Sequence, residues 1–309
     1  MTTEATLTTV LEEAFDDYAI DRRVRVGERN TVYAARADGQ RVACKLTDCQ
    51  PGVLAREARL QRAVGESAPV AVPDVLASTD GCLVLEWLDA EPFGDHRQRG
   101  PERFRAVGAA LARLHAATAN RFDGHGTLAV DGDGLAVEEG TDWPTRFATF
   151  VQRWADDLDG TSDADVGAAV LDAVIRHSGA FADVPPVLIH GEASPDHVLL
   201  DDDTVALIDW ELGQAAPGGF DLVWAERDLL GRPLDDGHAE IREVLLDGYR
   251  EVRALGDAFD CRRELYRAGF ATRELGLWHD PDRAVENERE NHRKRLRSFV
   301  FDRLDAAGD

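Results

Sequence analysis

The stretch 190–200, followed shortly by 206–211, constrains the fold of this chain more than any other part of the sequence. Two short apolar runs bracket a polar turn there, and each run delivers an acidic residue, Glu192 or Asp209, to a loop. Apolar runs of this length between polar turns are typical of buried strands. This is how a fold places a proton acceptor and a metal-binding carboxylate beside a phosphate group.

The chain N-terminal to this stretch begins with a helical pattern and then changes to strands. We expect a helix over 1–20 and strands over 23–26, 31–35, 40–46, 74–78 and 82–88. Asp38-Gly39 is a strong signal for a tight hairpin turn between the second and third strands. Pro51 starts a helix that continues to Val64. The sequence therefore predicts a five-stranded antiparallel lobe with one helix inserted after its third strand.

Beyond Leu88 the composition changes, because 89–101 is rich in proline, glycine and charge, as hinges and linkers are. Apolar residues then recur at helical spacing. We expect a Gly- and Asp-rich loop over 119–140 and helices over 102–117, 143–158, 163–180, 219–230, 238–255, 259–277 and 283–306. The expected division of this α+β chain is an N-terminal helix 1–20, a small lobe 21–88, a linker 89–101 and a large helical lobe 102–309.

Composition excludes several classes of partner. The net charge of the 309 residues is −24, which repels nucleic acid and anionic membranes. No apolar run approaches the roughly 18 residues that span a bilayer, and the acidic N-terminus lacks a secretory pattern. Only Lys45 and Lys294 are lysines, and a dense carboxylate surface with so little lysine is typical of a high-salt cytoplasm. The four cysteines have no spacing suited to zinc.

The motifs resemble those of the aminoglycoside phosphotransferase and choline kinase superfamily, in which H-G-D-x-x-x-x-N is followed by I-D-W or I-D-F. The chain keeps His190, Gly191 and Asp209 but has Glu192 in place of the family aspartate and His197 in place of the asparagine. The order and spacing of the motifs over roughly 20–230 imply a bilobal, protein-kinase-like fold. The final eighty or so residues resemble the family only as a run of helices.

The resemblance also implies a nucleotide site in the small lobe. Lys45, at the end of the third strand, matches the lysine that holds nucleotide phosphates, and Glu57 matches its glutamate partner. Gly27 lies in the expected phosphate-covering loop, and the main chain of Glu86 and Leu88 matches the hinge that reads an adenine edge. The simpler alternative for Lys45 is a surface lysine at a strand end, although this arginine-dominated chain keeps few lysines.

The remaining roles follow the catalytic loop. Asp209 matches the Mg²⁺-binding aspartate, and Glu192 stands where the family base orients the acceptor hydroxyl, although its extra methylene displaces the carboxylate. His197 is a better ligand for Mn²⁺ or softer ions than for Mg²⁺, and alternatively contacts a phosphate or tunes Glu192. We expect Asp221 to brace the loop by hydrogen bonds, and His190 and His115 to be structural.

The implied function is an ATP-dependent phosphotransferase with Mg²⁺ or Mn²⁺ as cofactor. Its acceptor would be a hydroxyl group of a small molecule, such as an aminoglycoside, a sugar, a choline-like compound or another metabolite. The departures at Glu192 and His197 keep open a pseudokinase that binds a nucleotide or metabolite with little transfer, and, more remotely, nucleotidyl transfer. The choice between ATP and GTP and the oligomeric state also stay open.

Overall fold

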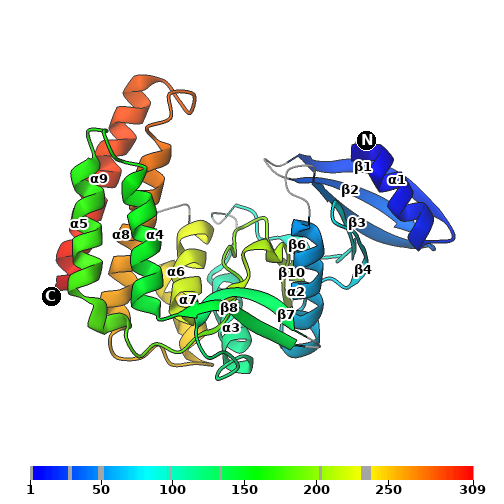
Figure 1. Cartoon of the computed structure of the whole chain (residues 1–309), viewed down its shortest axis with the longest axis horizontal. Coiled ribbons are helices and arrows are strands. Elements are labelled where there is room, and N and C mark those ends of the chain that lie inside the picture. The colour runs from blue at the N-terminus through cyan, green and yellow to red at the C-terminus, as the bar shows by residue number, and fades with distance from the viewer. Residues whose placement is uncertain are drawn as a thin grey trace.

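The computed structural model describes residues 3–26, 30–47, 52–95, 97, 99–131, 134–201, 204–230 and 238–308. An antiparallel sheet with two helices forms one end of the molecule, and helices form the other end, with the two termini far apart (Figure 1). This arrangement confirms the expected α+β, kinase-like fold.

The first sheet contains five antiparallel strands in the order β1-β2-β3-β5-β4. Asp38 and Gly39 have φ values of 47° and 81°, the left-handed conformation that a two-residue hairpin needs, and they connect β2 to β3 as predicted. The sheet strands are β1 (Tyr18–Val26), β2 (Asn30–Ala37), β3 (Gln40–Thr47), β4 (Val75–Ser78) and β5 (Cys82–Glu86).

Alternation along β3 determines which way Lys45 faces. Side chains along a strand point to opposite faces in turn, and Cys44 and Leu46 pack with α1 (Thr3–Ala14) on one face of the sheet. Lys45 therefore points to the other face, against which α2 (Val53–Ser67) packs. This places Lys45 opposite Glu57 of α2.

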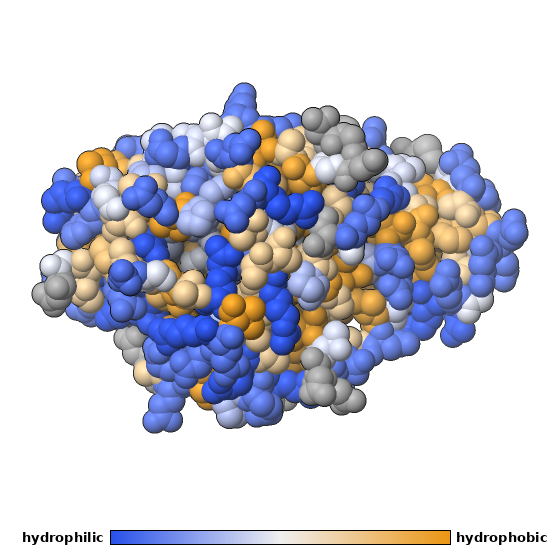
Figure 2. Space-filling view, turned by 90° about the horizontal axis from the view of Figure 1, so that it is seen from below, coloured by the Kyte–Doolittle hydropathy of each residue, from blue (hydrophilic) through white to orange (hydrophobic). Residues whose placement is uncertain are grey.

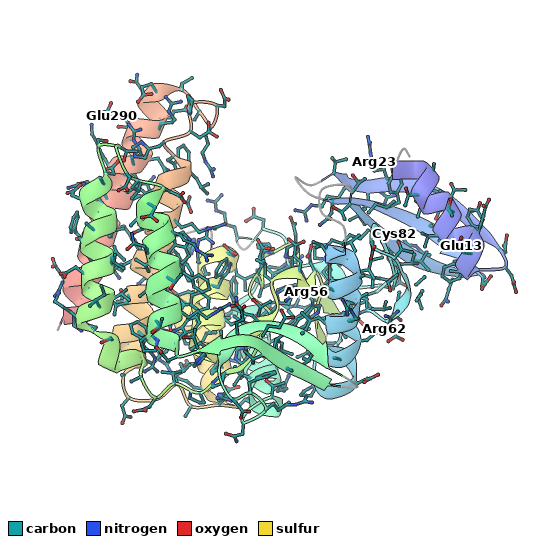
Figure 3. All side chains as sticks on the ribbon, viewed as in Figure 1. Glu13, Arg23, Arg56, Arg62, Cys82 and Glu290 are labelled. Atoms are coloured by element: carbon teal, nitrogen blue, oxygen red, sulfur yellow. The ribbon has the colours of Figure 1, made fainter. Side chains whose placement is uncertain are left out.

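Helix α2 packs both against the sheet and against the hydrophobic core of the helical part. Its residues Leu54 and Ala58 pack against Leu83 of the sheet, whereas Leu60 and Val64 belong to the large hydrophobic cluster of the helical part. The side of α2 that carries Arg56 faces the helical part of the protein (Figure 3). The Arg56 guanidinium donates a hydrogen bond to the main-chain oxygen of Leu128, with a nitrogen-to-oxygen distance of 3.0 Å. One helix thus connects the two parts.

The helical part surrounds a core rich in aromatic side chains, in which Trp143, Phe147, Phe220 and Tyr266 pack edge to face or stacked. Its helices are α3 (Pro101–Ala117), α4 (Trp143–Asp156), α5 (Ala164–Arg176), α6 (Gly218–Leu229), α7 (Ala239–Arg250), α8 (Phe259–Leu277) and α9 (Glu286–Gly308), with a 3-10 turn over Ser178–Phe181. These bounds agree closely with the predicted helices.

The prediction of a loop over 119–140 was wrong. This region contains the hairpin β7 (His125–Asp131) and β8 (Gly134–Thr141), whose register pairs Leu128 with Val137. Of the described glycines and aspartates in this region, Asp131, Gly134 and Gly140 lie at or near strand ends, and residues such as Leu128 and Val137 between them are compatible with a sheet.

Two further sheets position the catalytic region. Strand β10 (Val198–Asp201) lies between β11 (Thr204–Leu207) and the short β6 (Glu91–Pro92), so part of the expected linker is paired with the catalytic segment. Strands β9 (Val187–Ile189) and β12 (Gln214–Ala216) continue the sheet of β7 and β8. The turn between β9 and β10 therefore begins and ends at strands that are each paired with neighbouring strands, β9 with β12 and β10 with both β11 and β6.

Hydrophilic side chains are spread over the face seen in Figure 2 and do not gather in one patch. Within the described ranges, no helix is both long enough and apolar enough to cross a membrane. Of the cysteines, Cys44 and Cys82 are buried free thiols in the first sheet, and Cys261 is a partly buried free thiol.

Candidate active site

Lys45 is the centre of a buried ion cluster between the two parts of the molecule. Its ammonium donates to the Glu57 carboxylate at 2.8 and 3.1 Å and to Asp209 Oδ1 at 2.9 Å. Only 6% of Lys45 and 1% of Glu57 are exposed. The two residues predicted to pair are thus in contact, and the surface alternative for Lys45 is wrong.

The cluster contains more negative than positive charge, because Glu211 also lies 3.7 Å from the Lys45 ammonium. Burial lowers the pKa of Lys45, but Glu57 and Asp209 raise it more, so it stays above its ordinary value. Burial raises the pKa of Glu57 to about 7 although Lys45 opposes this, because further carboxylates lie close. One ammonium therefore does not balance three carboxylates.

Oxygen atoms of Glu57, Asp209 and Glu211 all lie within 4.8 Å of one another. Hard carboxylate oxygens are the ligands that Mg²⁺ prefers, and a divalent cation would supply the positive charge that the cluster lacks. The residues present therefore fit the metal that the fold implies. Glu211 was missed from the sequence, although its position two residues after Asp209 was an available signal.

The main chain presents Asp209 to this cluster in an uncommon conformation. Asp209 has φ 68° and ψ 71°, in the left-handed region, immediately before the 3-10 turn Trp210–Leu212. Aspartate tolerates this region better than most residues, and such outliers concentrate at functional sites. Burial raises the pKa of Asp209, but Lys45 and His197 lower it more, so the carboxylate stays ionised.

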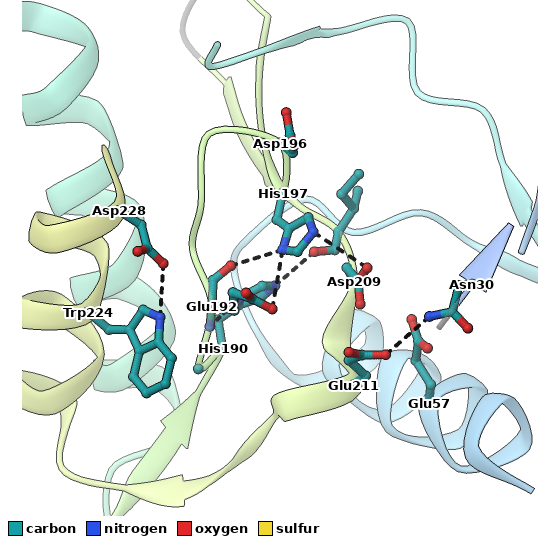
Figure 4. Close-up of polar contacts among 12 residues, drawn as sticks. Asn30, Glu57, His190, Glu192, Asp196, His197, Asp209, Glu211, Trp224 and Asp228 are labelled. Carbon is teal, nitrogen blue, oxygen red and sulfur yellow. Dashed lines mark hydrogen bonds and ion pairs between the residues drawn. The ribbon is translucent and has the colours of Figure 1, made fainter. Parts of the chain in front are cut away.

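Glu192 and His197 lie at the two ends of one tight loop (Figure 4). His197 Nδ1 lies 3.1 Å from the main-chain oxygen of Glu192 and 3.9 Å from its carboxylate, and His197 Nε2 lies 3.5 Å from Asp209 Oδ2. Burial raises the pKa of Glu192, and His197 only partly opposes this. A carboxylate with a raised pKa is better suited to accept a proton near neutral pH.

Asp221 holds the base of the loop, as predicted. Its carboxylate accepts hydrogen bonds from the main-chain N–H groups of His190 and Gly191, at 3.0 and 2.8 Å. Gly191 has φ 85°, and a Cβ there would lie 2.7 Å from the carbonyl oxygen of Leu212, so the loop requires glycine. Burial raises the pKa of Asp221, but the hydrogen bond from His115 and the nearby charges lower it more.

A buried chain of hydrogen bonds continues from Asp221 into the helices. His115 Nε2 lies 3.1 Å from Asp221 Oδ2, and His115 Nδ1 lies 2.9 Å from the hydroxyl of Tyr249. A carboxylate only accepts, so in the neutral ring Nε2 carries the hydrogen and Nδ1 accepts from Tyr249. His115 therefore has the structural role expected of it. Asp221 fixes its tautomer, and Tyr249, which was not predicted, donates to the remaining ring nitrogen.

His190 has a similar fixed role. The main-chain N–H of Glu192 donates to His190 Nδ1 at 3.3 Å, and His190 Nε2 in turn donates to the carbonyl of Ile208 at 2.9 Å. Complete burial lowers the pKa of His190, which agrees with a neutral ring. His190 thus ties the loop of Glu192 to the segment that carries Asp209.

The residues predicted to contact the nucleotide are only partly described. Gly27 lies outside the described residues. The N–H of Glu86 donates to the carbonyl of Asp74 at 2.9 Å, whereas the main chain of Leu88 makes no hydrogen bond within the described ranges. The Arg41 guanidinium lies over the Trp87 ring, with 4.1 Å between Arg41 Cζ and the ring centroid. At the edge of β2, Asn30 donates to Glu211 at 3.3 Å.

On the side of Glu192 away from Glu57, helix α6 contributes Trp224 and Asp228, which are hydrogen-bonded at 3.0 Å (Figure 4). Arg273 of α8 lies over the Trp224 ring at 5.9 Å and makes no hydrogen bond or ion pair with any described residue. These three residues could not be predicted from the sequence, because they come from two helices without a recognisable motif. Glu192 therefore lies between a carboxylate cluster and an aromatic and charged surface.

Residues 21–265 match the phosphotransferase enzyme family (APH). The chain belongs to this family. Family membership makes it a kinase-like phosphotransferase that acts on hydroxyl groups of small molecules. No curated protein matches the sequence.

Solved structures show the same fold in other family proteins. The aminoglycoside phosphotransferase APH(4)-Ia is 15% identical with a TM-score of 0.67, and the match covers 98% of this chain and 99% of that one. The macrolide 2'-phosphotransferase MphH from Brachybacterium faecium is 24% identical with a TM-score of 0.59, covering 95% and 98%. ADP-bound APH(2'')-Ib is 12% identical with a TM-score of 0.65, covering 98% and 99%. These likenesses support the fold.

Proposed function

We propose that this protein transfers the terminal phosphoryl group of ATP to a hydroxyl group of a small molecule. The observation that carries the proposal is the buried cluster in which Lys45 contacts both Glu57 and Asp209, because phosphoryl transfer depends on a fixed cation and a metal-binding carboxylate. Structures of APH(4)-Ia contain ADP or AMP-PNP together with hygromycin B, which supports a nucleotide and a hydroxylated acceptor here.

Each residue of the cluster has a proposed part. Lys45, oriented by Glu57, binds the nucleotide phosphates, and the main chain at Glu86 and Leu88 contacts the adenine edge. Asp209 and Glu211 hold Mg²⁺, which would neutralise charge on the phosphates when bound. Glu192 orients the acceptor hydroxyl and accepts its proton, since its pKa is raised and its side chain is 36% exposed.

The acceptor is proposed to bind on the side of Trp224, Asp228 and Arg273, where Glu192 is reached from outside the carboxylate cluster. Aminoglycosides, sugars, choline-like compounds and other hydroxylated metabolites all remain candidates. The adaptation to high salt stays a prediction from the acidic, lysine-poor composition. The cytoplasmic location stays a prediction from a sequence without a membrane-length apolar run or a secretory pattern.

The first experiment is a calorimetric titration of ATP in molar KCl, with Mg²⁺, with Mn²⁺ and with a chelator, followed by assays of ADP release with added acceptors. We expect metal-dependent binding and acceptor-dependent release of ADP. Lys45→Met should abolish both, whereas Lys294→Met should abolish neither, because Lys294 is an exposed lysine paired with Glu290 on α9. ATP binding without transfer to any acceptor would favour the pseudokinase, and no binding would overturn the proposal.

A further inference from the structure

In the described part of the chain, the guanidinium of Arg273 on α8 has no hydrogen-bond acceptor and no ion-pair partner. The other three arginines of this helix, Arg262, Arg263 and Arg267, each donate to a carbonyl oxygen or a carboxylate. The chain has 59 acidic residues against 35 basic ones, so carboxylates are not scarce. The unpaired state of Arg273 is therefore a property of its position.

The carboxylate that α6 places on this side of Glu192 already has donors of its own. Asp228 Oδ2 accepts a hydrogen bond from Trp224 Nε1 at 3.0 Å, and Asp228 Oδ1 lies 3.0 Å from Arg227 Nη1 (Figure 4). Arg227 thus balances the charge of Asp228. Arg273 keeps its charge and its N–H donors for an acceptor that the described residues do not supply.

The surroundings of Arg273 make an unpaired charge unfavourable. Its side chain is half-buried, and a guanidinium stays protonated in proteins. Burial and the nearby Arg227 lower the pKa of Arg273, and the carboxylates of Asp228 and Glu192 oppose this only in part. The influence of Glu192 also means that its carboxylate lies near the guanidinium. A half-buried charge without a partner is costly, so an anionic ligand would stabilise it.

The Trp224 ring favours one kind of anion. Arg273 Cζ lies 5.9 Å from the ring centroid, and the indole N–H is held by Asp228. A guanidinium over an aromatic ring keeps the N–H groups at its edge available, and this planar fork matches a carboxylate with two parallel hydrogen bonds. A phosphate group carries close to two charges. One unpaired guanidinium therefore matches the single charge of a carboxylate better.

We propose that Arg273 binds a carboxylate group of the acceptor, which makes the acceptor a hydroxy acid. The inference rests on the proposed function and narrows its substrate class. While Arg273 holds the carboxylate, a hydroxyl group of the same molecule faces Glu192. The hydroxyl oxygen forms a bond to the terminal phosphorus of ATP, and the bond from that phosphorus to the oxygen of ADP breaks. The hydroxyl proton passes to Glu192.

The test compares compounds that differ in one terminal group. Glycerate, glycerol and aminopropanediol form a short series with a carboxylate, a neutral and an amine member, and gluconate, glucitol and glucamine form a longer one. Glycerol phosphate is added as the phosphate member. Calorimetry measures binding of each compound to the full-length protein with AMP-PNP and Mg²⁺, and ADP release from ATP measures transfer. In at least one series we expect the carboxylate member to bind about tenfold or more tightly than the others.

Variants of Arg273 assign the preference to this side chain. Arg273→Gln should weaken binding of the carboxylate member about tenfold or more, while ATP affinity and binding of the neutral member stay within about twofold. Arg273→Lys keeps a positive charge but not the planar fork, so it should recover part of the loss. The control is Arg250→Gln, which removes an exposed arginine of α7 paired with Glu243 and Asp247 and should leave every affinity unchanged.

Several results would overturn the inference. Tighter binding of the neutral, amine or phosphate members, or equal affinity for the carboxylate member in the wild type and in Arg273→Gln, would do so while the proposed function survives. Binding of no member of either series would also overturn it. If the wild-type protein binds no ATP either, the proposed function fails as well. The comparison within each series uses the wild-type protein, so it decides the question even where a variant is unstable.

Discussion

Tyr249 gives the sharpest test of how the catalytic loop is held. Its side chain is 1% exposed, and its hydroxyl is the donor to His115 Nδ1 in the chain that ends at Asp221. Tyr249→Phe removes that donor and leaves a buried nitrogen without a partner, which costs about 1–3 kcal/mol. In a chain of this size each kcal/mol lowers Tm by about 2 °C, so we expect a drop of roughly 2–6 °C.

The same change should loosen the loop. Without the hydrogen bond from Tyr249 the His115 ring is positioned less firmly against Asp221, and the N–H groups of His190 and Gly191 donate to Asp221. We expect these two amides to exchange with deuterium about fivefold faster for each kcal/mol lost. Calorimetry and hydrogen exchange measure the two effects in one variant, and ATP affinity should change little.

Tyr18→Phe is the matched control, because it removes an equivalent hydroxyl whose hydrogen bond, to Glu12, is exposed. Its Tm and loop exchange should equal those of the wild type. Gly218→Ala provides an independent route to the same bond, since a Cβ there would lie 2.6 Å from both His115 Nδ1 and the Tyr249 hydroxyl. The double variant with Tyr249→Phe should lose less stability than the sum of the two. An unchanged Tm together with unchanged amide hydrogen exchange in Tyr249→Phe would refute this account of the hydrogen bonds that join Tyr249, His115 and Asp221.

Three further predictions concern the charged residues of the site. Glu192→Gln should abolish phosphoryl transfer while ATP affinity stays within about twofold, and undiminished turnover would remove Glu192 from its role as base. Because burial raises the pKa of Glu192, the acid limb of kcat/KM should lie above pH 4.3, the ordinary value for glutamate, and a pH-rate profile with a lower limb would contradict this. The pKa of Asp221 is held below its ordinary value of about 3.9, so its contribution to stability is complete above that pH and is lost as the pH falls through the folded-state value. Acid unfolding should therefore be less steep in Asp221→Asn, which should be less stable than the wild type at neutral pH; equal steepness would rule out Asp221 as a source of the acid sensitivity.

Local pattern was enough to predict most of the helices and the strands of the first sheet, because strand alternation and helical spacing are properties of short segments. The bilobal, kinase-like arrangement was predicted from the resemblance to a known family. Alternation places Cys44 and Lys45 on opposite faces of β3, but Lys45 was chosen as a site residue because it ends the third strand, where the resemblance implies a phosphate-binding lysine. The hairpin β7–β8 was missed because glycine and aspartate at the ends of its strands resemble a loop. Glycine and aspartate are common both in loops and at the turns of hairpins, so their presence does not distinguish the two.

The site was only partly predictable, because several of its contacts join distant parts of the chain. Lys45 and Asp209 were found through motifs, whereas Tyr249 and Arg273 belong to helices with no motif. Glu211 lies two residues after Asp209, and this position was the signal that could have found it, although the 3-10 turn Trp210–Leu212 that carries it was not predicted. Residues that act by long-range packing leave no periodic signal.

Helix α2 restricts how the molecule opens. Leu54 and Ala58 belong to the core of the sheet, and Leu60 and Val64 belong to the core of the helices. Exposing an apolar side chain of this size costs about 1.5–3 kcal/mol, so swinging the sheet away with its helix would cost several kcal/mol. We therefore expect the sheet to slide along α2 as a shear motion and not to open as a free hinge. The rate of nucleotide exchange would then depend on local movement of the segments at the edge of the sheet, and not on opening of the whole sheet.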